Sequence, residues 1–253
     1  MTIRTDRHDS VVVLNFDRPE RKNAITAAMY AQLADGLGQA AEDASVRVVV
    51  IAGSDSVFTA GNDLGDFMNN PPRGGESSVT RFLRTIATFP KPLIAAVCGP
   101  VVGVGTTMLL HCDQVYAGDN AKFSMPFVNL GLCPEAASSL LLPMIVGYQR
   151  AADKLLFGET FGADEALQMG IVSRVLPAAE VNAFALARAQ VLASKPAASL
   201  AVTKALMKRP LAEAIAAAML AEGEQFGKLL SGPAAREAFS AFMAKRKPDF
   251  SKV

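Results

Sequence analysis

The sequence predicts an α/β protein, in which a core of alternating strands and helices precedes an all-helical C-terminal region. The chain has 253 residues, 51% of them apolar, which is enough to bury a large core. Apolar, β-branched runs alternate with helical patterns over residues 1–176, as in a parallel sheet covered on both faces. From Glu180 onward only helical patterns follow one another. We therefore predict a core over residues 1–176 and a helical region over 177–253.

The predicted strands are short apolar runs bounded by turn residues. They cover residues 10–17, 46–52, 93–97 and 171–176. Thr26 is a good helix N-cap, and apolar residues recur every four positions behind it. This pattern predicts an amphipathic helix that ends near Asp43.

The remaining helices are predicted from apolar patterning and from their end signals. One starts after Asn62-Asp63, and residues 69–75 (NNPPRGG) behind it have the composition of a mobile loop. Others cover 79–88, 106–111, 136–146 with a kink at Pro143, 149–157, and 163–169 with Gly170 as its C-terminal cap. The C-terminal region has helical runs at about 180–194, 197–207, 211–230 and 233–245, the last opening on a proline.

Charge and composition argue against several function classes. The net charge is +1, so no overall field predicts a nucleic-acid or membrane partner. Residues 1–10 lack an apolar signal core, and no apolar run has membrane-spanning length. Three unpaired cysteines are typical of reduced thiols in a cytoplasmic protein. The last three residues, 251–253, differ in one residue from the Ser-Lys-Leu peroxisomal signal, which we interpret as coincidence.

The usual cofactor and nucleophile patterns are missing from the sequence. His8 and His111 are far apart, so neither a metal site nor a histidine-dependent triad is predicted. Two glycine turns follow predicted strands, Thr59-Ala60-Gly61 and Gly103-Val104-Gly105. If neighbouring strands place these turns side by side, two backbone N–H groups converge on one oxygen and form an oxyanion hole. Two ordinary β–α turns are the other interpretation of the same spacing.

Five segments, in order along the chain, resemble motifs of the crotonase (enoyl-CoA hydratase/isomerase) superfamily. They are 17–24 (DRPERKNA), 57–64 (VFTAGNDL), 90–105 (PKPLIAAVCGPVVGVG), 112–117 (CDQVYA) and 236–250 (REAFSAFMAKRKPDF). The resemblance covers about residues 10–250. It implies a crotonase-like ββα spiral core and a helical C-terminal region for trimerisation, in homotrimers often paired into hexamers. It also implies an acyl-CoA thioester substrate with no separate cofactor, because CoA is part of the substrate.

The resemblance assigns roles by position. The backbone N–H groups of Ala60 and Val104 are expected to form the oxyanion hole for the thioester carbonyl. Such donors stabilise the enolate that forms when a proton α to a thioester is removed, and one donor contributes about 2.7–4 kcal/mol. The residues expected to bind the acyl-CoA are Lys22, Ala24, Ala60, Gly61, Asp63, Leu64, Thr107 and Phe127. Asp63 has a second interpretation as a helix cap, and Thr107 and Phe127 as core residues.

Departures from the family pattern narrow the reaction. Where the family's hydratases carry two glutamates, this chain has Thr107 and Phe127, which cannot hold and deprotonate a water. The segment 130–139 (LGLCPEAASS) is instead similar to the peroxisomal-type Δ3,Δ2-enoyl-CoA isomerases. There, a single glutamate moves a proton from C2 to C4. The resemblance therefore predicts an isomerase with Glu135 as the acid/base.

Three alternatives stay open from the sequence. Glu135 follows a proline, a common helix opening, so its side chain could cap a helix instead of reaching a substrate. An enoyl-CoA hydratase and a non-catalytic acyl-CoA-binding homologue are the other functions considered. The isomerase reading requires the Glu135 carboxyl to face the oxyanion amides rather than solvent, in an apolar environment that raises its pKa.

Overall fold

The computed structural model describes residues 2–69 and 77–253 and contains a six-stranded sheet. The strands predicted at 10–17, 46–52 and 93–97 lie in its centre, and the one predicted at 171–176 forms an edge. Its strands, in spatial order, are β1 (Ile3–His8), β2 (Val11–Phe16), β3 (Val48–Ala52), β4 (Leu93–Val97), β6 (Gln114–Gly118) and β9 (Arg174–Leu176). β1 pairs antiparallel with β2, and all other pairs are parallel. β6 was not among the predicted strands, and neither was β1, most of whose side chains are polar and exposed.

A second, smaller sheet is built from the segments that follow the main strands. It consists of β5 (Pro100–Val102), β7 (Lys122–Ser124) and β8 (Phe161–Gly162). β4 is followed directly by β5, and β6 by β7, so each turn of the chain adds one strand to each sheet. Two isolated bridges, Ile25 with Asn62 and Thr59 with Val101, continue this series in the earlier turns. The arrangement is the predicted ββα spiral.

The helices follow the predicted order. They are α1 (Ala27–Glu42), α2 (Leu64–Asn69), α3 (Ser78–Thr88), α4 (Val104–Thr107), α5 (Ser138–Val146), α6 (Tyr148–Ala152), α7 (Ala163–Gln168), α8 (Val181–Ala193), α9 (Ala197–Lys208), α10 (Ala212–Leu230) and α11 (Pro233–Met243). Thr26 caps α1 as predicted, because its hydroxyl accepts from the Met29 N–H. Residues 70–75 of the loop predicted at 69–75 lie outside the described residues.

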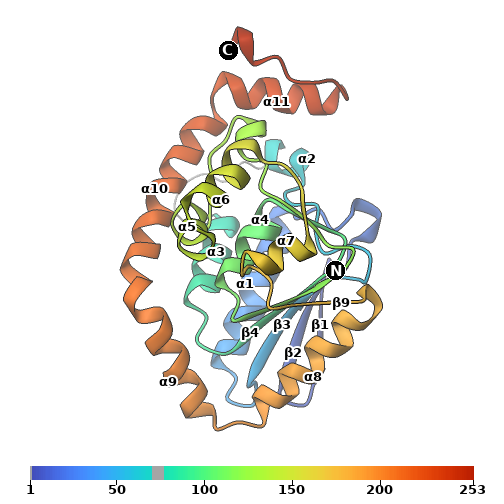
Figure 1. The fold of residues 1–253 in the computed structure, drawn as a ribbon, viewed down its shortest axis with the longest axis vertical. Helices are drawn as coiled ribbons and strands as arrows, with labels where there is room; N and C mark the ends of the chain where they lie inside the picture. The colour runs from blue at the N-terminus through green and yellow to red at the C-terminus, as the bar shows by residue number, and fades with distance from the viewer. Residues whose placement is uncertain (1, 70–76) are drawn as a thin grey trace.

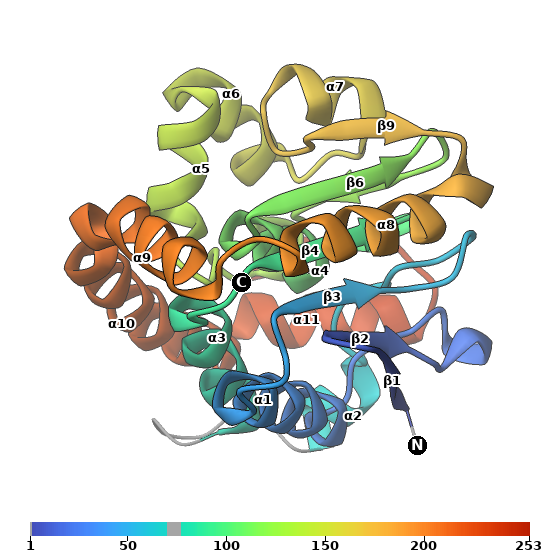
Figure 2. The ribbon, with the colours of Figure 1, turned by 90° about the horizontal axis from the view of Figure 1, so that it is seen from below.

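Helices cover both faces of the main sheet (Figures 1 and 2). On one face, Leu14 and Ile51 belong to the same apolar cluster as Leu33 of α1. On the other face, Val50 packs with Ala185 of α8. Burial on both faces explains why the strand sequences are almost continuously apolar. α8 lies beyond the predicted division at 176/177 but covers the sheet; the division itself stays a prediction.

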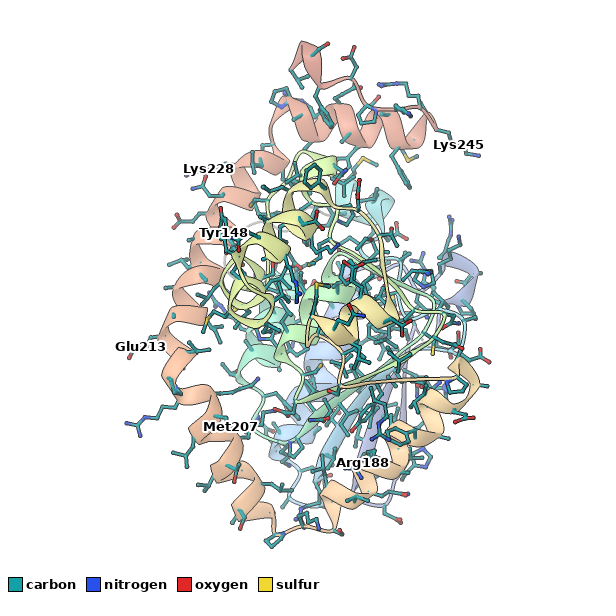
Figure 3. The ribbon with its side chains drawn as sticks, viewed as in Figure 1. Tyr148, Arg188, Met207, Glu213, Lys228 and Lys245 are labelled. Atoms are coloured by element: carbon teal, nitrogen blue, oxygen red, sulfur yellow. The ribbon has the colours of Figure 1, made fainter. Side chains whose placement is uncertain are left out.

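The last three helices frame one side of the molecule: α9 and α10 run along its edge, and α11 crosses at one end (Figure 1). Lys204 of α9 is buried, and its ammonium group pairs with Asp113 at 2.6 Å and donates to the Lys91 carbonyl oxygen at 2.6 Å. Large apolar side chains remain exposed on α9 and α10, and Met207 is visible in Figure 3. Across the described parts of the chain, no helix has the length and apolar character needed to cross a membrane.

Candidate active site

The glycine turn that follows β5 positions the N-terminus of α4 in the interior of the protein. Gly103 takes a positive φ of 57° and stands as the N-cap of α4, whose four residues are all buried. The Gly103 N–H donates to the Ser124 carbonyl oxygen at 2.9 Å, and the Thr106 hydroxyl donates to the Val101 carbonyl oxygen at 2.6 Å. At the first position of α4, the Val104 N–H has no acceptor within the helix. This N–H group is therefore suited to a substrate oxygen.

The second predicted oxyanion donor requires a correction. The Ala60 N–H donates to the Lys22 carbonyl oxygen at 2.9 Å, so it is already occupied and points away from β5. Asn62 instead forms the parallel bridge with Ile25, in which the Ile25 N–H donates to Gly61 and the Asp63 N–H donates to Ile25. The residue between two such bonds turns its own N–H to the opposite side. The N–H of Asn62, not that of Ala60, therefore faces the side on which Val104 lies.

Gly61 makes this close approach possible. Its φ is +84°, and a Cβ atom there would stand 2.9 Å from the Val102 carbonyl oxygen. The Asn62 side chain is held from α1, because the buried Tyr30 hydroxyl donates to its Oδ1 at 2.5 Å. Burial raises the pKa of Tyr30 well above its ordinary value, and the neighbouring Glu135 raises it further, so the phenol stays a donor.

Glu135 lies beside α4 in the interior. Its carboxyl accepts a hydrogen bond from the Thr107 hydroxyl at 2.6 Å, and only 9% of the residue is exposed. Thr107 is three residues after Val104, so the carboxyl and the Val104 N–H belong to one helical turn. Burial raises the pKa of Glu135 to about 7, against the opposing effect of the Thr107 bond and with a further increase from Glu222. A carboxyl with this pKa can take up and return a proton at neutral pH.

The capping interpretation of Glu135 does not fit this geometry. α5 begins at Ser138, two residues later than predicted, and its N-cap is Ala137. The Glu135 side chain points to Thr107, and only its backbone carbonyl oxygen accepts from Ser138.

The predicted acyl-CoA residues cluster in one place, apart from three. Lys22, Ala24, Ala60, Gly61 and Asp63 surround the turn between β3 and α2. Leu64 opens α2 and packs against the core. Thr107 lies with Glu135, and Phe127 is a buried core residue with 5% exposure.

Asp63 has a structural task in this cluster. Its carboxylate pairs with Arg18 at 2.7 Å and accepts from the Asp66 N–H at 3.1 Å, which caps α2. Partial burial acts to raise the pKa of Asp63, but the Arg18 and backbone donors outweigh it and lower the pKa. Arg18 also donates to the Ala24 carbonyl oxygen at 2.9 Å, so this ion pair fastens the 17–24 and 57–64 segments together.

No cluster of three or more histidine, cysteine, aspartate or glutamate residues is placed to hold a metal ion within residues 2–69 and 77–253. A hollow of about 680 Å³ beside α6 and α7 includes none of the predicted site residues. Its Lys154 is paired with Asp153 at 2.7 Å and with Glu165 at 2.6 Å.

Comparison with known proteins shows which family the chain belongs to. Residues 6–252 match the family model described as enoyl-CoA hydratase/isomerase. The chain belongs to this family. It is 35% identical over 246 residues to 2,3-dehydroadipyl-CoA hydratase of Escherichia coli K12, covering 96% of each chain. It is also 34% identical over 215 residues to human enoyl-CoA delta isomerase 2, which covers 82% of this chain but about half (54%) of the isomerase.

The family's solved structures share the fold. The Pseudomonas aeruginosa OdaA structure superposes with a TM-score of 0.93 at 44% identity, covering 96% of this chain and 98% of that one. The crotonase fold predicted from the sequence motifs is thereby confirmed, as a sheet core with a helical C-terminal region. The relatives of this chain include both hydratases and isomerases, so the reaction has to be inferred from the residues of the site and not from family membership.

Proposed function

We propose that this family member isomerises 3-enoyl-CoA to trans-2-enoyl-CoA, with Glu135 as the acid/base. The observation that supports the proposal is one buried carboxyl, with a pKa of about 7, hydrogen-bonded to the helical turn that carries the Val104 N–H. The two positions where the family's hydratases carry glutamates hold Thr107 and Phe127, both buried and neither ionisable.

The proposed reaction needs a single proton carrier. Ionised Glu135 removes a proton from C2, and the electron pair moves toward the thioester oxygen as an enolate. The N–H groups of Val104 and Asn62 stabilise this charge, each donor contributing about 2.7–4 kcal/mol. Protonated Glu135 then gives the same proton to C4 while the C2–C3 double bond forms and the carbonyl is restored. No water or cofactor enters the balance.

A hydratase is the second candidate, favoured by the 35% identity to an Escherichia coli hydratase over 96% of both chains. Adding water requires groups that hold and deprotonate the water and protonate carbon. Glu135 is one such group, and Thr107 already donates its hydroxyl to it.

Product mass, together with the absorbance of the conjugated thioester, distinguishes the candidates. The purified protein is incubated separately with a 3-enoyl-CoA and a trans-2-enoyl-CoA. An isomerase converts the first into a conjugated product of unchanged mass, whereas a hydratase converts the second into a 3-hydroxyacyl-CoA heavier by one water. Binding of both thioesters without any conversion would instead identify a non-catalytic acyl-CoA-binding protein and refute the proposal.

We further propose a homotrimer, or a hexamer formed from two trimers. The supporting observation is the set of large apolar side chains exposed on α9 and α10, which a monomer leaves in water. They are Val202, Leu206, Met207 and Leu220. Light scattering coupled to gel filtration measures the assembly, and a monomer in solution would contradict the proposal. The cytoplasmic compartment also stays a prediction.

A further inference from the structure

The segment behind Glu135 is tied to the distant helix α10 by one side chain. The Glu222 carboxylate accepts from the Ala137 N–H at 2.6 Å, from the Ser139 N–H at 2.9 Å and from the Ser139 hydroxyl at 2.5 Å. In addition, the Cys133 thiol donates to the Glu222 carbonyl oxygen at 3.7 Å. All four donors therefore flank Glu135 in the sequence, on either side of it.

Glu222 is an unusual residue for its helix. α10 is 19 residues long, and Glu222 is its one buried residue, with 7% exposure. The Glu213 and Lys228 side chains of the same helix point away from the body of the molecule (Figure 3). A buried carboxylate without donors is costly, and this one accepts three hydrogen bonds from residues 137–139. The contact between α10 and the start of α5 is thus built around this one charge.

The segment that Glu222 holds is conformationally strained. Ala136 and Ala137 have φ values of 61° and 55°, a left-handed conformation that costs a non-glycine residue roughly 1–2 kcal/mol. Such conformations persist where the surroundings hold them. On its other side, His111 Nε2 bonds to the Ala136 carbonyl oxygen at 2.8 Å. Burial lowers the pKa of His111 to about 4, so a neutral imidazole can donate this bond. Glu222 and His111 together fix the two strained residues.

We propose that Glu222 is a positioning residue, whose carboxylate on α10 holds residues 137–139 and thereby keeps the Glu135 carboxyl against Thr107. The inference rests on the proposed function of Glu135. It goes further by making the active-site geometry depend on a helix of the C-terminal region.

Electrostatics gives this role a measurable signature. Within the described part of the chain, four groups interact with the Glu135 carboxyl: Thr107 from α4, Tyr30 from α1, Glu222 from α10, and Cys133 on its own segment. Only Glu222 among them is a second carboxylate, and its charge raises the pKa of Glu135. Besides Glu135, the Glu222 carboxylate interacts with one further titratable group, the Cys133 thiol. Removing the Glu222 charge should therefore lower the pKa of Glu135.

The test compares Glu222→Gln with Glu224→Gln, which removes an exposed carboxylate two residues away on the same helix. Carbon NMR of protein labelled at its glutamate carboxyls follows the titration of Glu135. The Glu135 signal is identified by its absence from the spectrum of Glu135→Gln. We expect a lower Glu135 pKa and a loss of roughly 10-fold or more in kcat for Glu222→Gln, because small misplacements at a reacting centre can cost on the order of 10²-fold. Glu224→Gln should match the wild type in both. A Glu222→Gln protein with wild-type titration and kcat would overturn the proposal.

Two further measurements distinguish a failure of the proposed isomerase function from a failure of the Glu222–Glu135 coupling. The NMR titration needs no substrate, so a wild type that fails to isomerise 3-enoyl-CoA refutes the proposed function while the Glu222–Glu135 coupling is still measured. If Glu222→Gln does not fold, the wild type alone decides. Its Glu222 carboxyl carbon should show a second inflection at the pH where Glu135 titrates. A single inflection, independent of Glu135, would contradict the coupling.

Discussion

Two buried carboxyls lie near one another in this protein, and their hydrogen bonds divide the tasks between them. Glu222 has three donors from residues 137–139, which act to lower its pKa, but burial outweighs them and the pKa of Glu222 is raised. Glu135 has one neutral donor, Thr107, and its pKa of about 7 lies near neutral pH. Paired titratable groups with different environments are typical of acid/base sites. Glu135 is thus the member suited to exchange a proton, whereas the three bonds of Glu222 suit it to hold residues 137–139 in place.

Replacing the proposed acid/base should separate turnover from binding. Glu135→Gln keeps the shape and one acceptor for the Thr107 hydroxyl but cannot carry a proton. We expect kcat for 3-enoyl-CoA isomerisation to fall by roughly 10²–10⁴, the usual contribution of general acid–base catalysis. Acyl-CoA binding, measured by calorimetry with a saturated thioester, should change little. Turnover equal to that of the wild type would exclude Glu135 as the acid/base.

Thr107 should tune the pH at which the enzyme works. The hydroxyl donates to the Glu135 carboxylate and so lowers the pKa of that group. In Thr107→Val the pKa of Glu135 should rise, and the acidic limb of the kcat–pH profile should move to higher pH, because the base must be ionised to take the first proton. Thr88→Val, an exposed change on α3, serves as the control. An unmoved limb, or one that moves to lower pH, contradicts the assignment.

Residue-level signals explain both the success and the limits of the sequence-based prediction of the site. The glycine turn around Val104 and the carboxyl of Glu135 stand in recognisable motifs, and Glu135 accepts from Thr107, three residues after Val104 in α4. The sequence did not show that the Ala60 N–H is bonded to Lys22, because the direction of an N–H depends on pairing with a distant segment, which the motif does not reveal. Glu222 has no local signal at all, since its role depends on contacts 83–85 residues away.

At the scale of elements, periodicity and caps predicted the helices well, because each depends on residues close in sequence. α1 begins after Thr26 and ends before Asp43, as expected. The predicted start of α5 was two residues early, because Ala136 and Ala137 adopt left-handed conformations that alanine rarely takes. Five strands were missed. β1 has exposed polar residues, and β5, β7 and β8 have only two or three residues each. β6 was also not predicted.

The turn between β4 and β5, which passes the chain from one sheet to the other, should not tolerate a side chain. Gly99 has a φ of +60°, and a Cβ there would lie 1.8 Å from the Ser56 carbonyl oxygen. Gly99→Ala should lower the free energy of unfolding by roughly 2–5 kcal/mol, combining left-handed strain with overpacking. Gly147→Ala is the matched control, because its φ is +85° but nothing lies within 4 Å. Urea unfolding should show a clearly smaller loss for Gly147→Ala; equal losses would contradict the steric argument.

At the scale of the whole molecule, buried charges join the helical C-terminal region to the core. Lys204 of α9 pairs with Asp113 at the start of β6, and Lys208 donates to the His111 carbonyl oxygen at 3.0 Å. Glu222 of α10 makes the corresponding contact with residues 137–139. These links connect residues 83–97 positions apart, so composition could predict a helical region but not where it attaches.

Two buried titratable groups, Glu135 and His111, should make the free energy of unfolding depend on pH in opposing ways. The pKa of Glu135 is raised to about 7, so the folded state binds a proton more tightly than the unfolded state, and this stabilisation is lost as pH rises from about 4.5 through 7. The pKa of His111 is lowered to about 4, so its contribution is instead lost as pH falls from about 6.5 to 4. The two effects partly cancel in the wild type.

Glu135→Gln removes the first effect and leaves the second. The variant should therefore gain free energy of unfolding relative to the wild type as pH rises, reaching up to about 3 kcal/mol above pH 7, since one pKa unit corresponds to about 1.4 kcal/mol. Urea unfolding of both proteins at pH 5 and pH 8 measures this difference. Glu224→Gln, whose carboxylate is exposed, should show no such trend. A stability difference that stays constant with pH would mean that Glu135 is ionised at low pH in the folded protein, and the proton-shuttle proposal would lose its physical basis.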